Sequence, residues 1–312
     1  MLVIMIQEMV NLIFIGHLND AKLLAGVGIG NMIQNVCGLS LVIGLNGALE
    51  TLVSQANGAG NLALCGVYLN RGRFVLAMTF LPIIIILFQS EAILVGIGQN
   101  AEVSHHAQAY VIAYLPGLIL SGMIDSQRRF LNMLGYTKIP MICQTMGQVF
   151  HVLLCYIFVW KLEMSITGIG IASSITNLII FLSLIQFTNW TEDIQEAVQW
   201  PDKNTFRGIR QYYALGIPSA LMLCLEWWAF EAMSLITGYI GVDEQAAQLL
   251  IFNIIGILFM FALGIQQVAS SLIGKQIGMN NIRKAKEYHK ALNFVAFVII
   301  CGAVGLFCVF HT

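Results

Sequence analysis

Nine apolar segments of about 16 to 25 residues follow one another along this chain, separated by polar connectors. A helix needs about 20 apolar residues to cross the hydrocarbon core of a bilayer. The segments are residues 1–16, 23–47, 74–90, 107–124, 139–160, 166–187, 212–236, 246–268 and 291–310. The pattern predicts an all-α, polytopic membrane protein with about nine transmembrane helices in the lipid bilayer.

The composition excludes several other classes of protein. Hydrophobic residues make up 58% of the 312 residues and charged residues only 10%, whereas a soluble chain carries about 25% charged residues. The net charge of −1 gives no basic surface for nucleic acid. The seven cysteines and six histidines show no metal-ligand spacing, and no Asp/Asp or Ser/His pair lies at membrane depth. We therefore expect no metal, no cofactor and no enzyme.

The basic residues are divided unevenly between two sets of connectors. The connectors after the second, fourth, sixth and eighth segments hold 13 of the 15 lysines and arginines, and the others hold only Lys22 and Lys161. This count places Arg128 and Arg129 in the connector after the fourth segment. Because cytoplasmic loops carry the excess of Lys and Arg, we expect these connectors and residue 1 to face the cytoplasm. The pattern does not distinguish the plasma membrane from a vacuolar or endomembrane location.

A shift of 220 residues aligns the region after the second segment with the region after the eighth. It places Leu52 on Leu272 and Gly58 on Gly278. This self-similarity indicates a duplicated six-helix unit, in which segments one to three correspond to segments seven to nine. Since six is even, both copies enter the membrane from the same side. Secondary transporters use such parallel repeats, with the substrate bound between the halves.

The repeat divides the chain into three parts. We expect a complete six-helix N-terminal lobe at 1–187, a cytoplasmic linker at 188–211 and a partial C-terminal lobe at 212–312. The predicted fold class is thus one complete six-helix lobe plus a truncated second lobe, in a chain that is a monomer.

Two glutamates interrupt the seventh apolar segment. Glu226 and Glu231 flank a run that contains Trp227 and Trp228, and no Lys or Arg lies in the same segment. Placing a carboxylate near the bilayer centre costs about 2.5–3.5 kcal/mol of free energy. We therefore expect Glu226 and Glu231 to have a functional role. Such a group can exchange a proton for a bound cation, and tryptophan rings bind organic cations. The alternative is that both glutamates form hydrogen bonds with neighbouring helices and so have a structural role. For Glu8, in the first segment, we expect a structural role.

Other polar residues in the apolar segments are candidates for binding substrate or protons. Gln144, Gln148 and His151 recur at spacings of four and three residues, so they share one helix face. That face either lines a cavity or bonds to neighbouring helices. Asn31 and Asn253 are further candidates of the same kind.

Several stretches of the chain together resemble the multidrug and toxic compound extrusion (MATE) transporters of eukaryotic type. They are GLNGALETLVSQANGAG at 44–60 and the runs at 68–73, 115–118, 128–132 and 226–231. The resemblance covers essentially the whole chain. It implies twelve helices in two six-helix lobes around a V-shaped cavity, and export of cationic drugs or metabolites driven by inward flow of protons or sodium.

The resemblance also bears on individual residues. It assigns ion coupling to Glu226 and Glu231, since Asn11 stands where many bacterial members have an acid in the first helix. Some animal members have a glutamate at the position of Asn253. The resemblance therefore implies no cofactor beyond the coupling ion, H⁺ or Na⁺.

The leading interpretation is a secondary active antiporter that exports small organic cations or xenobiotics in exchange for protons or Na⁺. One alternative is a lipid-linked precursor flippase of the same superfamily, which predicts a more basic cavity than the acidic one expected here. Another is a non-transporting fragment, inactive as this truncated chain.

Overall fold

The structure, a computed structural model, describes residues 2–18, 20–240 and 242–310. Within these ranges, some side chains lie outside the described set. They are those of residues 2–5, 21, 234–235, 238–240, 242–247, 249–255, 257–258, 303–304 and 306–310.

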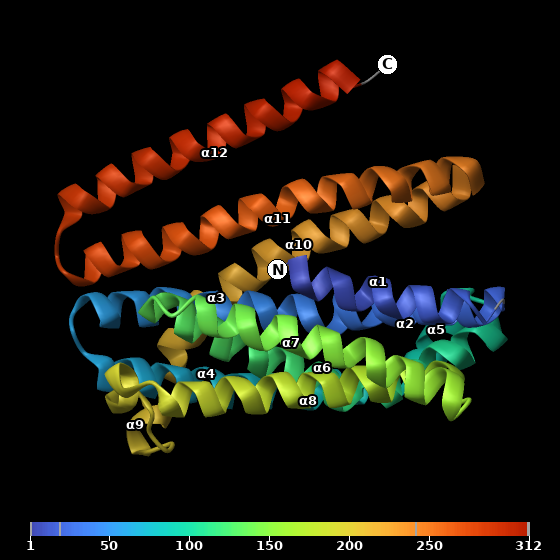
Figure 1. Cartoon of the computed structure of the whole chain (residues 1–312), viewed down its shortest axis with the longest axis horizontal. Helices are drawn as coiled ribbons and strands as arrows, with labels where there is room; N and C mark the ends of the chain where they lie inside the picture. Colours follow the sequence, from blue (N-terminus) through green and yellow to red (C-terminus); the bar gives the residue numbers. More distant parts are fainter. Residues whose placement is uncertain (1, 19, 241, 311–312) are drawn as a thin grey trace.

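The regular structure of the described residues is entirely helical (Figure 1). The helices are α1 (Leu2–Gly16), α2 (Ala21–Gln34), α3 (Ser40–Gly58), α4 (Leu62–Phe88), α5 (Ser90–Gly96), α6 (Ala101–Leu134), α7 (Lys138–Cys155), α8 (Ser165–Trp190), α9 (Lys203–Phe206), α10 (Ile209–Ile240), α11 (Val242–Gly278) and α12 (Ile282–Phe310). Two π-helical turns, η1 (Asn35–Leu39) and η2 (Tyr156–Lys161), continue α2 into α3 and extend α7. A 3₁₀ helix, η3 (Glu192–Ala197), follows α8.

The long helices agree with the predicted apolar segments. Each of the nine segments lies in one long helical stretch, with α2, η1 and α3 together forming the second. Among described residues, six helices are long and apolar enough to cross a membrane: Lys22–Gly58, Leu62–Phe88, Ala101–Leu134, Lys138–Lys161, Ser165–Trp190 and Ile209–Met233. Ile6–Gly16 is a shorter apolar helix. The predicted all-α fold class is confirmed.

The connectors alternate between the two ends of the helical bundle (Figure 1). Those at 59–61, 135–137, 191–208 and 279–281 lie at one end, which we call the basic end. Most of the lysines and arginines lie in these connectors or in the parts of the helices nearest to them. This clustering agrees with the charge pattern of the sequence; that the basic end faces the cytoplasm stays a prediction.

The segment between α8 and α10 is docked on α4 at the basic end. Nε and Nη2 of Arg71 donate hydrogen bonds to the backbone oxygens of Thr205 (3.1 Å) and Asn204 (2.9 Å). Gly66 of α4 lies so close to η3 that a Cβ there would be 2.2 Å from the backbone oxygen of Ala197. The linker is thus fixed to the first helices by backbone contacts.

The C-terminal helices pack chiefly on α3. Both α10 and α11 run along α3, whereas α12 lies against α11 (Figure 1). The six helical stretches before the linker pack closely around α6 and α3, with their main core residues buried. The two groups of helices therefore meet along α3.

Candidate functional site

A cavity of about 650 Å³ lies between the first six helical stretches and the pair α10 and α11. Its walls come from α1, α2, η1, α3, α6, α7 and α8 on one side and from α10 and α11 on the other. Cavities of about 300–1,000 Å³ hold drug-sized ligands. The cavity is therefore large enough for a small organic molecule.

Small residues bring α10 against α3 and so set the position of its glutamates. A Cβ on Gly44 would lie 2.3 Å from the Cα of Ala220, and one on Gly47 would lie 2.1 Å from the hydroxyl oxygen of Ser219. Only glycine permits so close an approach of two helices. Two turns further along α10, Glu226 reaches the cavity.

Glu226 and Trp227, two of the candidate residues, line the cavity. Within the described part of the chain, the Glu226 carboxylate has no ion pair and no hydrogen bond. Trp228 is placed differently: its indole N–H donates to the backbone oxygen of Val36 (3.2 Å) and its ring is 43% exposed. The acid and one of the two tryptophans thus share the cavity wall, and the second tryptophan ties α10 to η1.

Glu231 is half-buried and is not among the lining residues of the cavity, whereas Glu8 lines it. In the structure Glu8 faces the cavity, and the structural role expected for it stays a prediction.

The predicted polar stripe of α7 divides between the cavity and the protein interior. Gln144 and Gln148 line the cavity. His151 is fully buried; its Nε2 lies 2.9 Å from Oδ1 of Asn11 and its Nδ1 lies 3.0 Å from Oγ1 of Thr176. Both imidazole nitrogens have partners, so His151 connects α1, α7 and α8.

Asn31 also lines the cavity, where its Oδ1 accepts a hydrogen bond from the hydroxyl of Tyr110 (2.8 Å). Tyr110 in turn stacks on Tyr114, with ring centroids 6.1 Å apart. The side chain of Asn253 lies outside the described residues. That candidate accordingly stays a prediction.

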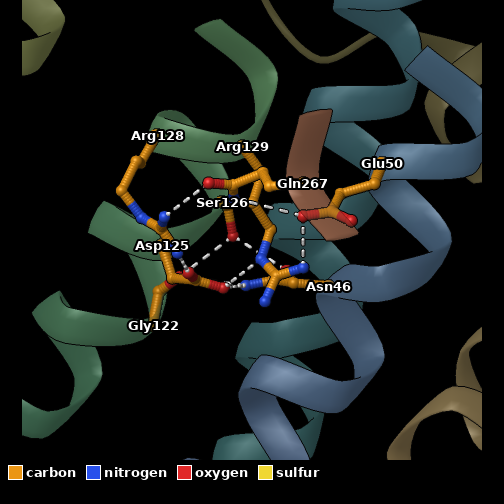
Figure 2. A network of polar contacts seen from close by, with 8 residues as sticks. All are labelled: Asn46, Glu50, Gly122, Asp125, Ser126, Arg128, Arg129 and Gln267. Carbon is orange, nitrogen blue, oxygen red and sulfur yellow. Dashed lines mark hydrogen bonds and ion pairs between the residues drawn. The ribbon is translucent and has the colours of Figure 1, made fainter. Parts of the chain in front are cut away.

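A buried network of charged residues lies at the cavity toward the basic end (Figure 2). Asp125 of α6 pairs with Arg128 and, through Oδ2, with Nε of Arg129 at 2.7 Å. Nη1 of Arg129 donates to Oε1 of Glu50 on α3 at 2.6 Å. All four residues are less than 9% exposed. Their four charges cancel, which lowers the cost of removing each of them from water.

Neutral side chains complete the network (Figure 2). Asn46 donates to Asp125 (2.8 Å) and accepts from Ser126 (3.1 Å). Gln267 of α11 joins from the other group of helices. Its Oε1 accepts from Nη1 of Arg128 and its Nε2 donates to Oε1 of Glu50, both at 3.3 Å. One amide therefore links α11 to both α3 and α6.

The sequence interpretation missed this network because it assigned the charges near 125–129 to a connector. In the structure Asp125, Arg128 and Arg129 lie inside α6, and Glu50 lies inside α3. A usable signal existed, since an Asp followed by Arg at i+3 and i+4 forms ion pairs on one helix. The correction changes the expected charge of the cavity: four acids and two arginines line it, rather than acids alone.

Among the described residues, no cluster of three or more His, Cys, Asp or Glu side chains is able to hold a metal ion. Six cysteines of the described part are free thiols. The polar groups of the cavity can accept protons, bind cations and form hydrogen bonds.

These features define a class: a helical membrane protein with a drug-sized cavity between two groups of helices. Within that class the chain belongs to the MatE family, whose model matches residues 1–157 and 218–312. The match covers more than half of the chain and includes most residues of both walls of the cavity.

Known relatives agree with this assignment. Multidrug and toxin extrusion protein 1 of Danio rerio is 30% identical over 303 residues, which are 97% of this chain and 50% of that protein. Protein DETOXIFICATION 16 of Arabidopsis thaliana is 30% identical over 308 residues, 96% of this chain and 60% of the relative. The chain thus spans about half to three fifths of the length of these relatives.

A solved structure shows the same fold. The crystal structure of the eukaryotic MATE transporter AtDTX14 superposes with a TM-score of 0.89 at 25% identity, over 99% of this chain and 70% of that chain. Coverage of 70% of that chain agrees with the predicted fold class of one complete lobe plus a truncated second lobe. The eukaryotic type of the family is confirmed.

Proposed function

We propose that this chain contributes to a secondary active antiporter that exports small organic cations or xenobiotics in exchange for protons or Na⁺. The observation that carries the proposal is the position of Glu226 beside Trp227 in a cavity of about 650 Å³. The relatives named for multidrug and toxin extrusion support the same substrate class. The proposal includes no catalysis and no cofactor other than the coupling ion.

The physical basis is competition between a proton and an organic cation for one carboxylate. Glu226 has no cationic partner among the described residues, so a positive ligand can neutralise it. The ring of Trp227 offers a π-face beside the same carboxylate, and such faces attract ammonium groups. Protonation of Glu226 removes that attraction and releases the cation, which couples the two movements.

The remaining parts of the proposal follow from the sequence. Residue 1 and the basic end face the cytoplasm, and the functional unit is a monomer. The lobes are 1–187 and 212–312, joined by the linker 188–211. We expect Glu231, the second acid of α10, to take part in the same exchange of proton and cation as Glu226.

The flippase alternative requires a cavity that attracts anionic headgroups. Arg128 and Arg129 do line the cavity, but Asp125 and Glu50 pair with them. Glu226 and Glu8 add two further acids to the lining. The net negative charge of the cavity lining therefore favours a cation over an anionic headgroup.

Uptake of labelled tetraethylammonium into proteoliposomes with an imposed pH or Na⁺ gradient tests the proposal. The whole open reading frame is used, and Glu226→Gln is compared with Glu196→Gln, an exposed acid of the linker. We expect the first variant to abolish gradient-driven uptake and the second to retain it. Equal uptake by both variants would contradict the coupling role of Glu226.

A further inference from the structure

Amide side chains form half of the polar lining of the cavity on the side of the first six helical stretches. Asn11, Asn31, Gln34, Gln148 and Asn177 are examples, contributed by α1, α2, α7 and α8. An amide carries no charge and offers both a donor and an acceptor. These amides therefore differ in chemistry from the carboxylate and indole of α10.

Three of these amides already have partners inside the protein. Asn31 accepts from Tyr110, and Asn11 contacts His151 and Ser173. The amide nitrogen of Asn177 donates to the backbone oxygen of Gly117 at 2.9 Å. These three amides are thus held in place by the helices around them.

Gln34 and Gln148 differ from the other three. Nε2 of Gln34 and Oε1 of Gln148 are buried and have no hydrogen-bond partner among the described residues. The two residues are 2% and 8% exposed, and both line the cavity. An unmade hydrogen bond of a buried polar group costs about 1–3 kcal/mol, so two of them at one cavity need an explanation.

The two glutamines each lie near other polar residues of the cavity wall. Nε2 of Gln148 donates to Oε1 of Gln7 (3.2 Å), one turn before Asn11 in α1. Tyr110 bonds to Asn31 and interacts with Asn11, and Gln34 follows Asn31 by three residues. Gln34 and Gln148 are therefore each within about one helical turn, along the chain or through a hydrogen bond, of another polar residue that lines the same cavity.

We propose that Gln34 and Gln148 form a subsite for the hydroxyl groups of a substrate, so that the cavity prefers organic cations that also carry several hydroxyls. A hydroxyl both donates and accepts, which matches an unpaired amide N–H on α2 and an unpaired amide oxygen on α7. The inference rests on the proposed function, because the carboxylate of Glu226 holds the positive charge of the same ligand. The inferred subsite adds the chemistry that recognises the uncharged part of the ligand.

A matched pair of ammonium ions tests the subsite. Tris(2-hydroxyethyl)methylammonium and triethylmethylammonium have the same charge and differ by three hydroxyl groups. Their affinities are measured by calorimetry on the purified full-length protein in detergent, so that no transport is required. One net hydrogen bond contributes about 0.5–1.5 kcal/mol, and about 1.4 kcal/mol is tenfold in affinity. We expect the wild type to bind the hydroxylated ion about tenfold more tightly.

Substitutions then locate the preference. Gln34→Leu and Gln148→Leu should each reduce the ratio of the two affinities by about threefold, while the affinity for triethylmethylammonium stays constant. Gln266→Leu is the control, since Gln266 lines the same cavity from α11 and has no buried unpaired atom. It should leave the ratio unchanged.

The outcomes separate the two proposals. If neither ammonium ion binds to the wild type, the proposed function fails and the subsite fails with it. If both bind with equal affinity, cation binding stands and the hydroxyl subsite is overturned. The subsite is also overturned if Gln34→Leu and Gln148→Leu weaken both ions equally, or if Gln266→Leu changes the ratio as much as they do.

Discussion

Gly58 of α3 and Gly278 of α11 occupy equivalent positions in the 220-residue repeat, and each lies against the backbone of the other helix. A Cβ on Gly58 would be 2.0 Å from the backbone oxygen of Lys275, and one on Gly278 would be 2.0 Å from that of Gln55. Gln55 and Lys275 are themselves related by the same shift. The contact is therefore reciprocal, as expected of two copies of one unit related by a twofold axis.

This reciprocal contact predicts a strong effect of adding one methyl group. Gly278→Ala would place its Cβ against the backbone of Gln55, and forced overpacking costs about 1–3 kcal/mol. We expect Gly278→Ala to lower the thermal midpoint of the purified protein. Gly264→Ala is the matched control in the same helix, because its Cβ would meet nothing within 4 Å. Alanine is the better helix former by about 1 kcal/mol, so that variant should unfold at the same or a higher temperature.

The buried ion pair between Arg129 and Glu50 predicts a non-additive pair of substitutions. Removing one partner of a buried pair leaves an uncompensated charge and costs about 3–5 kcal/mol. Glu50→Gln and Arg129→Met should each destabilise the protein more than the double variant does. A denaturant titration of the three variants measures this; single effects that simply add in the double variant would contradict the pairing. Arg283→Met, which breaks an exposed pair with Glu287, should change stability by less than about 1 kcal/mol.

The helices could be predicted from the sequence, but the buried ion pairs between them could not. Each long apolar segment has a helix because backbone groups in hydrocarbon must be satisfied within one element. The ends were harder to place. Apolar composition ends near residue 124, whereas α6 continues to Leu134 with Asp125 and both arginines buried inside it. Charge alone cannot show that an ion pair permits burial, since the partner Glu50 is 75 to 79 residues away along the chain.

The candidate site was predictable in part for the same reason. A lone acid in an apolar helix is visible in the sequence, and Glu226 does line the cavity. Which of two adjacent indoles faces the cavity depends on the rotation of α10, which its contacts with Gly44 and Gly47 fix. Periodicity placed Gln144, Gln148 and His151 on one face but could not show that Asn11 and Thr176 bury the third of them.

The capping box of α9 predicts a pH-sensitive linker. Desolvation alone would raise the pKa of Asp202, but hydrogen bonds from Thr205 and Asn204 outweigh it and hold the pKa below the ordinary value of 3.8. A carboxyl group with a lowered pKa stabilises the folded form above its unfolded pKa, and this stability is lost as the pH falls through the folded pKa. The protection of residues 203–207 against hydrogen exchange, taken relative to the intrinsic exchange rate at each pH, should therefore fall below about pH 4. Asp202→Asn should remove this pH dependence; a variant that keeps it would show that another group titrates.

The contacts of Gln267 predict that its side chain holds the two groups of helices together, a role that we call a latch. Its amide makes two bonds of 3.3 Å, to Arg128 and Glu50, and these are longer than the 2.6 Å ion pair between Arg129 and Glu50. If the helix groups separate at the basic end during transport, the weak amide bonds break first and the ion pairs stay with α3 and α6. Gln267→Leu should therefore favour the separated state.

Cysteine labelling measures this shift. Ser54 is fully buried, and its hydroxyl would lie 2.0 Å from a Cβ at Gly274, so a cysteine there reacts with a polar maleimide only when α3 and α11 part. In a background without other reactive cysteines, we expect Gln267→Leu to raise the labelling rate of Ser54→Cys by about threefold to tenfold, as the loss of one or two weak hydrogen bonds implies. Gln266→Leu, its neighbour in α11, should leave the rate unchanged. A latch is excluded if both variants label at the wild-type rate, because the bonds of Gln267 would then contribute nothing to the closed arrangement.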